Sequence, residues 1–436
     1  MRYGKLKAGL AIAGMLVGVA GMAAQPAFAD YAPTSKDVVG VGSDTLQYLV
    51  DFAADGDQLG DVGYNSGGNK YKLVNFDATA DANARLAYGP QGVGTGSCAP
   101  GDGGTAGTGN QTTLHSDQPC TLNPTIVVRA GVAPIQRPNG SGAGAKALAT
   151  DTNHFLTFAR ASACEGPTCA SGAGPLSTAF DSIQVGSDPL AMLAAKTTNA
   201  VPLSAQQLKA IYSCTDTTWT SVGGTSSDTI IPIIPQIGSG TRSTFLADIG
   251  LTTVGSCVVT GEENDPTAIA AQSSPADAIE PMSGGRLNLF LGLLSTGATN
   301  GFGGYFRDPS CPLNDINAGS PAACAAGTNV ISPSVKLITS GTPSDSNPLF
   351  DVSRPLYIYF RDSDVTSTTP WQPGSTLNAV RTLLYNPCLS GQTGCVTVNG
   401  VQYGPGGPPF FATAAAATDI SAAGIVPAYV PTVGGP

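Results

Sequence analysis

A short apolar run that stops at a glycine-serine turn restricts the fold of this chain more than any other feature. Residues 230–237 read IIPIIPQI, a β-rich pattern, and residues 238–241 read GSGT. A helix is expected next, with an apolar face formed by Phe245, Leu246 and Ile249. Ser239 or Thr241 can cap this helix, and the glycines let the backbone approach a ligand closely. The stretch therefore predicts a strand, a tight turn and a helix.

The same pattern occurs twice more along the chain. Residues 38–45 read VVGVGSDT and residues 139–144 read NGSGAG, and apolar residues follow both at helical spacing. A helix start presents unpaired N–H groups and the positive end of the helix dipole, so three starts can converge on one small oxyanion. A single turn of this kind fits an ordinary helix cap better than an anion site, and the repetition of the turn is what favours the anion site.

Apolar patterns elsewhere predict a chain in which strands alternate with helices. Strands are expected at 71–76, 126–128, 155–162, 183–195, 335–338 and 356–360. Helices are expected at 202–212, 266–280, 377–384 and 412–423. This alternation favours an α/β fold with mainly parallel sheets.

The first 29 residues have the pattern of a signal peptide. Arg2, Lys5 and Lys7 precede an apolar run, and residues 27–29 read AFA, which suits cleavage before Asp30. No cysteine lies near this point for lipid attachment, and no later run reaches the ~18 apolar residues that span a bilayer. The protein is therefore expected to be exported to the periplasm or the extracellular space, without membrane insertion.

Charge and cysteine content narrow the functional classes. Removing the three signal cations from the 20 Lys and Arg leaves 17 against 30 Asp and Glu, a formal balance of −13. Such an acidic surface argues against nucleic acid and anionic membranes as partners. Ten cysteines are predicted to form five loop-closing disulfides in sequential order: Cys98–Cys120, Cys164–Cys169, Cys214–Cys257, Cys311–Cys324 and Cys388–Cys395. Sequence alone leaves other pairings open.

No metal or cofactor site is predicted. The chain has no Cys-x-x-Cys motif, and its only histidines are His115 and His154. These residues do not provide the ligand spacing of a zinc site.

Several segments resemble the phosphate-binding proteins that serve phosphate ABC transporters. They are GSDT at 42–45, GSGAG at 140–144, FARAS at 158–162, PLS at 202–204, LKAIYS at 208–213 ahead of Trp219, and IPQIGSGTR at 234–242. The segments occur in family order and cover most of residues 37–290. The match to the last third of the chain is looser.

The resemblance implies an α/β, bilobal fold of the periplasmic-binding-protein type (type II), with two mixed or parallel sheets and a ligand cleft. Residues 30–190 plus 355–436 would form lobe 1, and residues 191–354 would form lobe 2. Carried over, the oxyanion donors are Ser43, Asp44, Thr45, Ser141, Gly142, Ser239, Gly240 and Thr241. Arg160 and Ser162 are added because they end a predicted strand where they can face the cleft.

Two positions depart from the family pattern. The family has a carboxylate just after the stretch that matches FARAS, where this chain has Ala163. It often has an arginine four residues before the serine of the third turn, where this chain has Pro235. We hypothesise that Asp44 replaces the carboxylate as proton acceptor, and that Arg242 or Arg160 replaces the cation. Asp44 can instead stabilise a helix N-terminus, and Arg242 can be a surface residue.

Three functions remain open at this stage. The first is a monomeric, non-enzymatic solute-binding protein that delivers phosphate or a similar oxyanion to an ABC permease. The second is a secreted relative that acts at the surface or as a scavenger without transport. The third is a hydrolase with Ser43 or Ser239 as nucleophile and His154 as base. No Gly-x-Ser-x-Gly motif surrounds these serines, which argues against the third.

Overall fold

The computed structural model describes residues 33–56, 62–69, 71–78, 125–169, 173–195, 197–265, 267–270, 272–290, 296, 335–338, 350, 352–366 and 377–432. The signal peptide, His115 and the predicted pairs Cys98–Cys120 and Cys311–Cys324 lie outside these residues. Within these stretches, no helix is both long and apolar enough to cross a bilayer.

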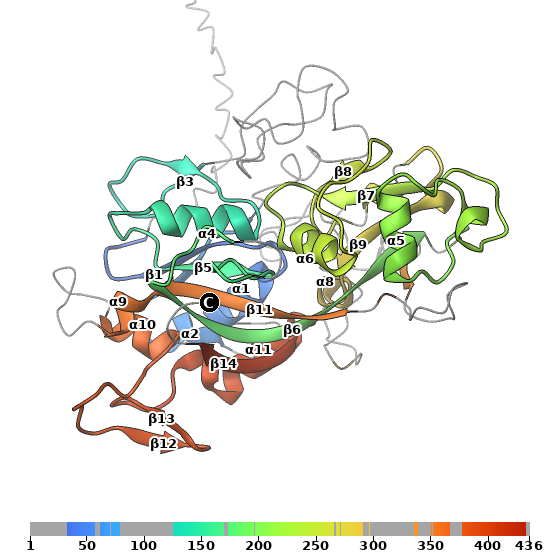
Figure 1. Cartoon of the computed structure of the whole chain (residues 1–436). Coiled ribbons are helices and arrows are strands. Elements are labelled where there is room, and N and C mark those ends of the chain that lie inside the picture. The colour runs from blue at the N-terminus through green and yellow to red at the C-terminus, as the bar shows by residue number, and fades with distance from the viewer. Residues whose placement is uncertain are drawn as a thin grey trace, which may run out of the picture.

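Ten of the described strands form one mixed sheet (Figure 1). Its main path is β2 (Leu73–Asn75), β1 (Val38–Gly42), β5 (Phe158–Ala161), β11 (Val352–Arg361), β6 (Phe180–Ala195), β9 (Ala278–Ser283), β7 (Ile231–Pro235) and β8 (Val259–Gly261). Strands β10 (Val335–Ile338) and β14 (Val426–Thr432) pair with β6. The outer strands are parallel, β1 with β2 and β5, and β7 with β8 and β9. The central strands β11 and β6 run antiparallel to their neighbours.

Strand β6 joins two groups of elements. Its residues 180–190 pair with β11, and its residues 190–194 pair with β9. In Figure 1, β1, β3, α4 and the C-terminal elements lie at one end of β6, whereas α5, α6, β7 and β8 lie at the other. We call these groups lobe 1 and lobe 2. The predicted residue boundaries of the lobes stay a prediction.

The described helices pack around this sheet. They are α1 (Gln47–Asp55), α2 (Gly63–Ser66), α4 (Ser141–Thr150), α5 (Ala205–Tyr212), α6 (Gly240–Asp248), α7 (Thr267–Ala270), α8 (Gly284–Phe290), α9 (Asp362–Thr366), α10 (Leu377–Leu383) and α11 (Ala414–Ala422). Three 3₁₀ turns are η1 (Trp219–Val222), η2 (Pro275–Asp277) and η5 (Phe410–Ala412). Two small hairpins are β3 (Thr125–Ile126) with β4 (Ile135–Gln136), and β12 (Val396–Val398) with β13 (Val401–Tyr403).

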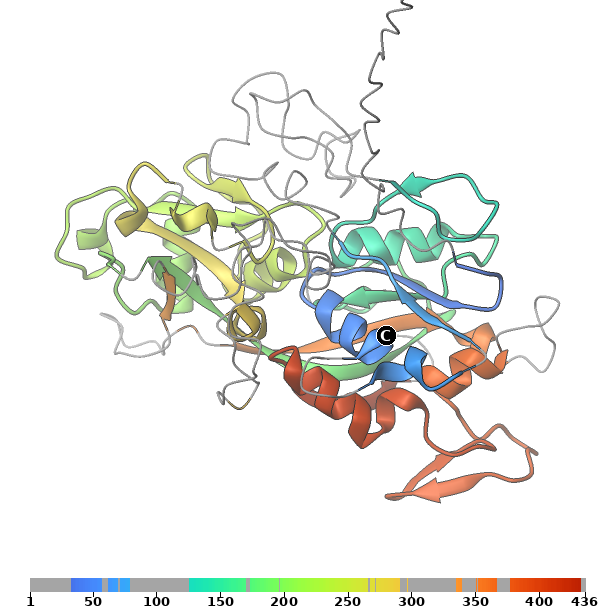
Figure 2. The same cartoon turned by 180° about the vertical axis from the view of Figure 1, so that it is seen from behind.

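The alternation of side chains along the strands explains why helices cover both faces in lobe 1. Successive strand residues point to opposite faces. Phe158 and Phe360 belong to the same buried cluster as α1 and α11, which lie toward the viewer in Figure 2. Ala159 and Tyr359 point the other way and pack with Leu148 of α4. Both faces of these strands are therefore buried.

Lobe 2 has its own apolar cluster beneath α5 and α6. The helix predicted at 202–212 is formed as α5, and Ser204 precedes it with a capping box to Gln207. The buried ring of Tyr212 packs edge-on against Phe245 of α6, with ring centroids 4.7 Å apart, and its hydroxyl donates to Ile233 O at 2.7 Å. The third predicted strand-turn-helix unit is thereby anchored as β7 and α6.

Two local predictions have different outcomes. The predicted helix at 266–280 is wrong, since among its described residues only Thr267–Ala270 is α-helical, Pro275–Asp277 is a 3₁₀ turn and Ala278–Ser283 forms strand β9. Strand β9 is buried along its whole length between β6 and β7, so tertiary pairing overrides its weak local pattern. Among the cysteines that the structure describes, the predicted disulfides Cys164–Cys169, Cys214–Cys257 and Cys388–Cys395 are all formed.

Candidate functional site

The three glycine-serine turns meet in the interior of the molecule. We call the segments 42–45, 139–142 and 238–241 the first, second and third turns. Gly42 pairs with Asn139 in a parallel bridge, and the Gly142 N–H donates to Gly238 O at 3.0 Å. Gly140 has φ of 101°, and a Cβ there would lie 2.4 Å from Gly238 O. Glycine is required at this position because both the dihedral angle and the close approach exclude a side chain.

Three serine hydroxyls meet where the turns touch. We call Ser43, Ser141 and Ser162 the serine cluster. The Ser43 hydroxyl donates to Ser162 Oγ at 3.1 Å, and Ser141 Oγ lies 3.3 Å from Ser162 Oγ. The Ser162 N–H donates to Ser141 Oγ at 2.9 Å. All three residues are buried.

Gly240 brings the third turn against this cluster. A Cβ at Gly240 would lie 2.3 Å from Ser141 Oγ and 2.4 Å from Ser162 Oγ. Since no real side chain tolerates such contacts, the absence of a side chain lets the start of α6 reach the hydroxyls. Ser239 caps α6, because its hydroxyl accepts the Arg242 N–H at 3.1 Å.

Two threonines and a glutamate lie beside the serine cluster. Thr241 donates to Glu263 Oε1 from its hydroxyl at 2.6 Å and from its N–H at 3.3 Å. The Thr45 hydroxyl donates to the same oxygen at 3.2 Å. We call Thr45, Thr241 and Glu263 the threonine–glutamate group. It links the first turn to the third, and the sequence analysis did not identify Glu263.

Asp44 is enclosed by Asn264, which follows β8, and by Arg286 of α8. Its Oδ2 accepts from Asn264 Nδ2 at 3.1 Å and lies 3.3 Å from Arg286 Nη2. The Arg286 guanidinium in turn lies 3.9 Å from the centroid of the Tyr48 ring. Asp44 thus forms a buried ion pair with Arg286, which links the first turn to α8. Asp44 lies shortly before α1 but does not cap this helix, because the N-cap residue is Leu46 and no side chain caps the helix start.

The two arginines proposed from the sequence hold main-chain carbonyls. Arg160 is buried and donates to Gly42 O at 3.0 Å, to Ser43 O at 3.2 Å and to Phe76 O at 2.9 Å. Burial lowers its pKa to about 10, so it stays charged at neutral pH. Arg242 Nη1 donates to Pro235 O at 2.9 Å. Arg160 therefore braces the first turn, whereas Arg242 binds the strand before the third turn.

Two buried carboxylates near the turns escaped the sequence analysis. Glu165 is only 7% exposed, and its Oε2 lies 3.7 Å from the position of a Cβ on Gly142. Burial, with a contribution from Glu263, raises the pKa of Glu165 to about 8. Burial, and to a lesser extent the negative charge of Asp44, raises the pKa of Glu263 as well. Ala163 stands where the family has a carboxylate, and Glu165 lies two residues further along the chain. The motif comparison did not consider Glu165.

The hydrolase alternative does not find its base in this arrangement. The His154 side chain is 34% exposed, and its Nδ1 lies 3.7 Å from Asp364 Oδ1. Asp364 belongs to α9, whereas in the serine cluster Ser43 follows β1, Ser141 begins α4 and Ser162 follows β5. His154 and the serine cluster therefore form separate sites in the described part of the chain.

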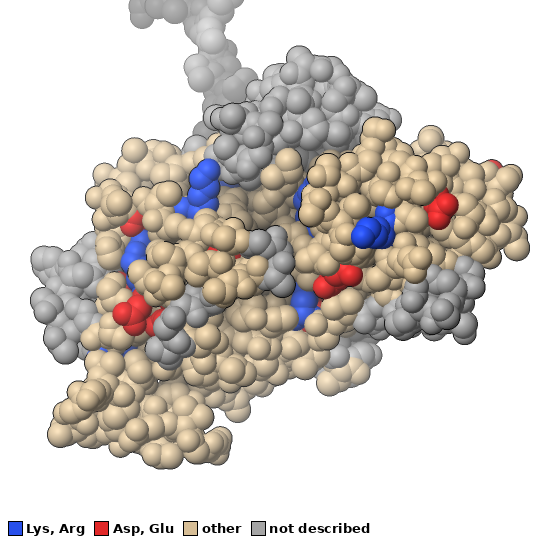
Figure 3. Space-filling model, in the orientation of Figure 1, with Lys and Arg blue, Asp and Glu red and all other residues tan. Residues whose placement is uncertain are grey.

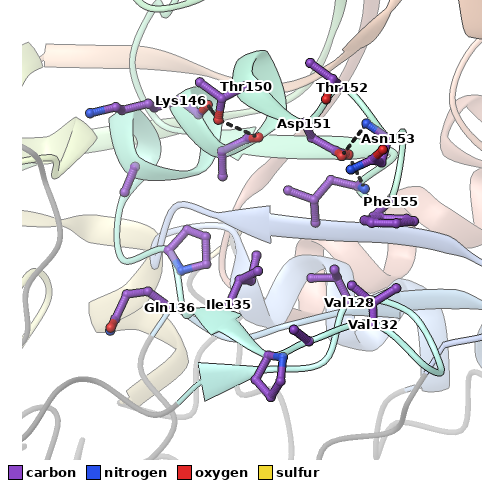
Figure 4. Close-up of a pocket in the computed structure, with 16 residues that line it drawn as sticks. Val128, Val132, Ile135, Gln136, Lys146, Thr150, Asp151, Thr152, Asn153 and Phe155 are labelled. Carbon is purple, nitrogen blue, oxygen red and sulfur yellow. Dashed lines mark hydrogen bonds between the residues drawn. The ribbon is translucent and has the colours of Figure 1, made fainter.

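A separate cavity of about 500 Å³ lies between α4 and the β3–β4 hairpin (Figure 4). Val128, Ile135 and Phe155 supply apolar walls, and Lys146 lies at its edge. Ser43, Ser141 and Ser162 are not part of its lining. The serine cluster and this cavity are therefore distinct features.

Three solved structures match this chain at low sequence identity. An ABC-type phosphate transport receptor from Vibrio cholerae is 13% identical, with 90% of this chain and 100% of that chain covered and a TM-score of 0.44. PstS from Borrelia burgdorferi is 12% identical, with coverage of 90% and 98% and a TM-score of 0.35. A phosphate-binding protein from Stenotrophomonas maltophilia is 17% identical, with coverage of 66% and 82% and a TM-score of 0.33.

The sequence of this chain matches one family profile. No curated protein matches the chain. The profile of the family described as "PBP superfamily domain" matches residues 106–365, more than half of the chain. This match includes the second and third turns and agrees with the α/β fold class that the sequence predicts. The described strands, however, form one ten-stranded mixed sheet instead of two mainly parallel ones, because β6 pairs antiparallel with β9, β10, β11 and β14. The chain belongs to the PBP superfamily.

Proposed function

We propose that this chain is an exported solute-binding protein that holds phosphate or a similar tetrahedral oxyanion where the three turns meet. The observation that carries the proposal is the approach of the Ser43 and Ser141 hydroxyls to within 3.3 Å of Ser162 Oγ, with Gly240 against Ser141 and Ser162. Three helices, α1, α4 and α6, begin at or near this point. Hydroxyl groups and helix N-termini are the neutral donors that suit a dehydrated oxyanion.

Neutral donors are important here because the nearby cations are already engaged. Arg160 donates to main-chain carbonyls, Arg286 pairs with Asp44, and Arg354 Nη2 lies 2.8 Å from Asp188 Oδ2. On the face shown in Figure 3, charged side chains are few and scattered. An oxyanion would therefore be held by short-range hydrogen bonds, and not by a basic surface patch.

The buried carboxylates suggest which oxyanion is accepted. Asp44 and Glu165 both lie beside the turns. A carboxylate accepts a hydrogen bond from a protonated oxyanion and repels one that carries no proton, such as sulfate. We therefore propose phosphate or arsenate as ligand over sulfate. Asp44 stays the proposed acceptor, with Glu165 as a second candidate.

Delivery of the ligand to an ABC permease is the transport role we propose for the chain. The motif resemblance and membership of the PBP superfamily support it. Neither the binding role nor the delivery role requires catalysis, a metal or a cofactor.

The test is ligand-dependent thermal melting of the mature chain, residues 30–436, with phosphate, arsenate and sulfate. Phosphate at 100 times its dissociation constant should stabilise the protein by about 2.7 kcal/mol. Ser141→Ala should remove most of this gain. Ser221→Ala is the matched control, because the exposed Ser221 hydroxyl donates to Thr218 O within its own turn. Equal melting temperatures with and without each anion would contradict the proposal.

A further inference from the structure

Glu263 is held in place by the other turns. It follows strand β8, and its N–H donates to Gln236 Oε1 at 2.7 Å. The Gln236 amide donates in turn to Asn139 Oδ1 at 3.1 Å. The main chain at Glu263 is therefore fixed to the strand before the third turn and, through Gln236, to the second turn.

The Glu263 carboxylate receives the donors that an oxyanion would need. Its Oε1 accepts from the Thr241 hydroxyl, the Thr241 N–H and the Thr45 hydroxyl, at 2.6, 3.3 and 3.2 Å. Its Oε2 is buried and has no hydrogen-bond partner among the described residues. A fully buried carboxylate with three donors on one oxygen has the coordination of a bound oxyanion, while its second oxygen is left unsatisfied.

We propose that Glu263 is an internal ligand of this site, which occupies the Thr45 and Thr241 donors and must be displaced when an oxyanion binds. The inference rests on the proposed function and adds a regulatory property to it. Displacement exchanges one anionic oxygen for another at the same donors, so Glu263 weakens oxyanion binding while it is ionised. Protonation of Glu263 removes its charge and weakens its hold on the donors.

The charges around Glu263 fix the direction of the pH dependence. Burial and then Asp44 raise the pKa of Glu263, whereas Arg354 lowers it. Glu165 faces it from the segment after β5, and Glu262 and Asp265 flank it in its own loop. As pH falls through this raised pKa, Glu263 takes up a proton and competes less. Oxyanion affinity should therefore increase on acidification, with net proton uptake on binding.

The experiment is calorimetric titration of the mature chain with phosphate from pH 5 to pH 8. Glu263→Gln keeps the shape of the side chain and removes its charge. At pH 8 it should bind phosphate about tenfold more tightly than the unaltered chain, and the difference should shrink toward pH 5. Because phosphate itself titrates identically in both experiments, the difference isolates Glu263. Glu263→Ala should change affinity in the same direction, which provides a second variant if the glutamine disturbs packing.

Glu280→Gln is the matched control. Glu280 is also buried with a raised pKa, and neither of its oxygens has a hydrogen-bond partner among the described residues. This variant should keep the affinity and the pH dependence of the unaltered chain. Equal or weaker phosphate binding by both Glu263 variants at pH 8 would overturn the inference and leave the proposed function standing. No phosphate binding by any of the four proteins would overturn both.

Discussion

The serine cluster and the threonine–glutamate group lie side by side but satisfy their hydroxyls differently. In the cluster, Ser43, Ser141 and Ser162 bond to one another without a charged partner. In the neighbouring group, Thr45 and Thr241 both donate to an ionisable carboxylate. Neutral hydroxyls can rotate toward an incoming anion, whereas donors on a carboxylate must first be released. An oxyanion can therefore bind the serine cluster directly, whereas it must compete with Glu263 for the donors of the threonine–glutamate group.

The largest effect is expected from Gly240→Ala, which places a methyl group against the serine cluster. The new Cβ would lie 2.3 and 2.4 Å from two serine oxygens, so α6 must move away from the cluster. Overpacking of this kind costs about 1–3 kcal/mol of unfolding free energy, and we expect phosphate affinity to fall by about 100-fold or more. Chemical denaturation and calorimetry measure the two quantities.

Gly67→Ala is the control for this change. A Cβ at Gly67 would meet its nearest neighbour, Asn69 Nδ2, at an ordinary 3.4 Å. This variant should leave phosphate affinity unchanged. An equal loss of affinity in both glycine variants would show that contact with the serine cluster is not the cause.

The next effect concerns the carboxylates and is a dependence of stability on pH. The folded protein raises the pKa of Glu165 to about 8, above its unfolded value, so folding favours the protonated form. The stability that this proton provides is complete below the unfolded pKa and is lost as pH rises through about 8. Glu165→Gln should remove a pH-dependent difference on the order of a few kcal/mol between pH 5 and pH 8. Urea unfolding at several pH values, in the absence of phosphate, gives the comparison. Parallel pH curves for the two proteins would count against the buried, protonated Glu165.

A smaller effect on phosphate affinity and stability is expected from Ser162→Ala within the serine cluster. The Ser162 hydroxyl lies between Ser43 and Ser141, so its removal deprives both of a partner. We expect phosphate affinity to fall about tenfold and stability to fall by about 1 kcal/mol. Ser162→Thr, which restores a hydroxyl, should recover part of the affinity. Full affinity in the alanine variant would remove Ser162 from the site.

The smallest effect is expected from Arg242→Ala. The sequence analysis proposed Arg242 as a cation for the ligand, but in the structure its guanidinium donates to Pro235 O. We therefore expect phosphate affinity to change by less than about threefold, since only a partly exposed main-chain bond is lost. A calorimetric loss of more than tenfold would reinstate Arg242 as a ligand-binding residue.

The sequence anticipated the parts of the site that are local. Each turn is encoded within about eight consecutive residues, and glycine positions such as Gly140 and Gly240 carry the close approaches. Superfamily membership agrees with the motif order. Sequence reasoning missed strand β9, because Pro281 and the buried Glu280 do not fit the pattern of a central strand.

The rest of the site depends on contacts between segments far apart in the chain. Glu263 meets Thr45 across 218 residues, and Arg160 reaches the Ser43 carbonyl across 117 residues. No periodicity or short motif records such a pairing. The adjacent pair Glu262-Glu263, just after a glycine at the end of a strand, was the one available signal.

A crystal structure of the mature chain grown with phosphate tests the central claim most directly. The account predicts one tetrahedral ion within hydrogen-bond distance of the Ser43, Ser141 and Ser162 hydroxyls and of the main chain at Gly240. Phosphate bound elsewhere, with the serine hydroxyls still bonded to one another, would contradict it.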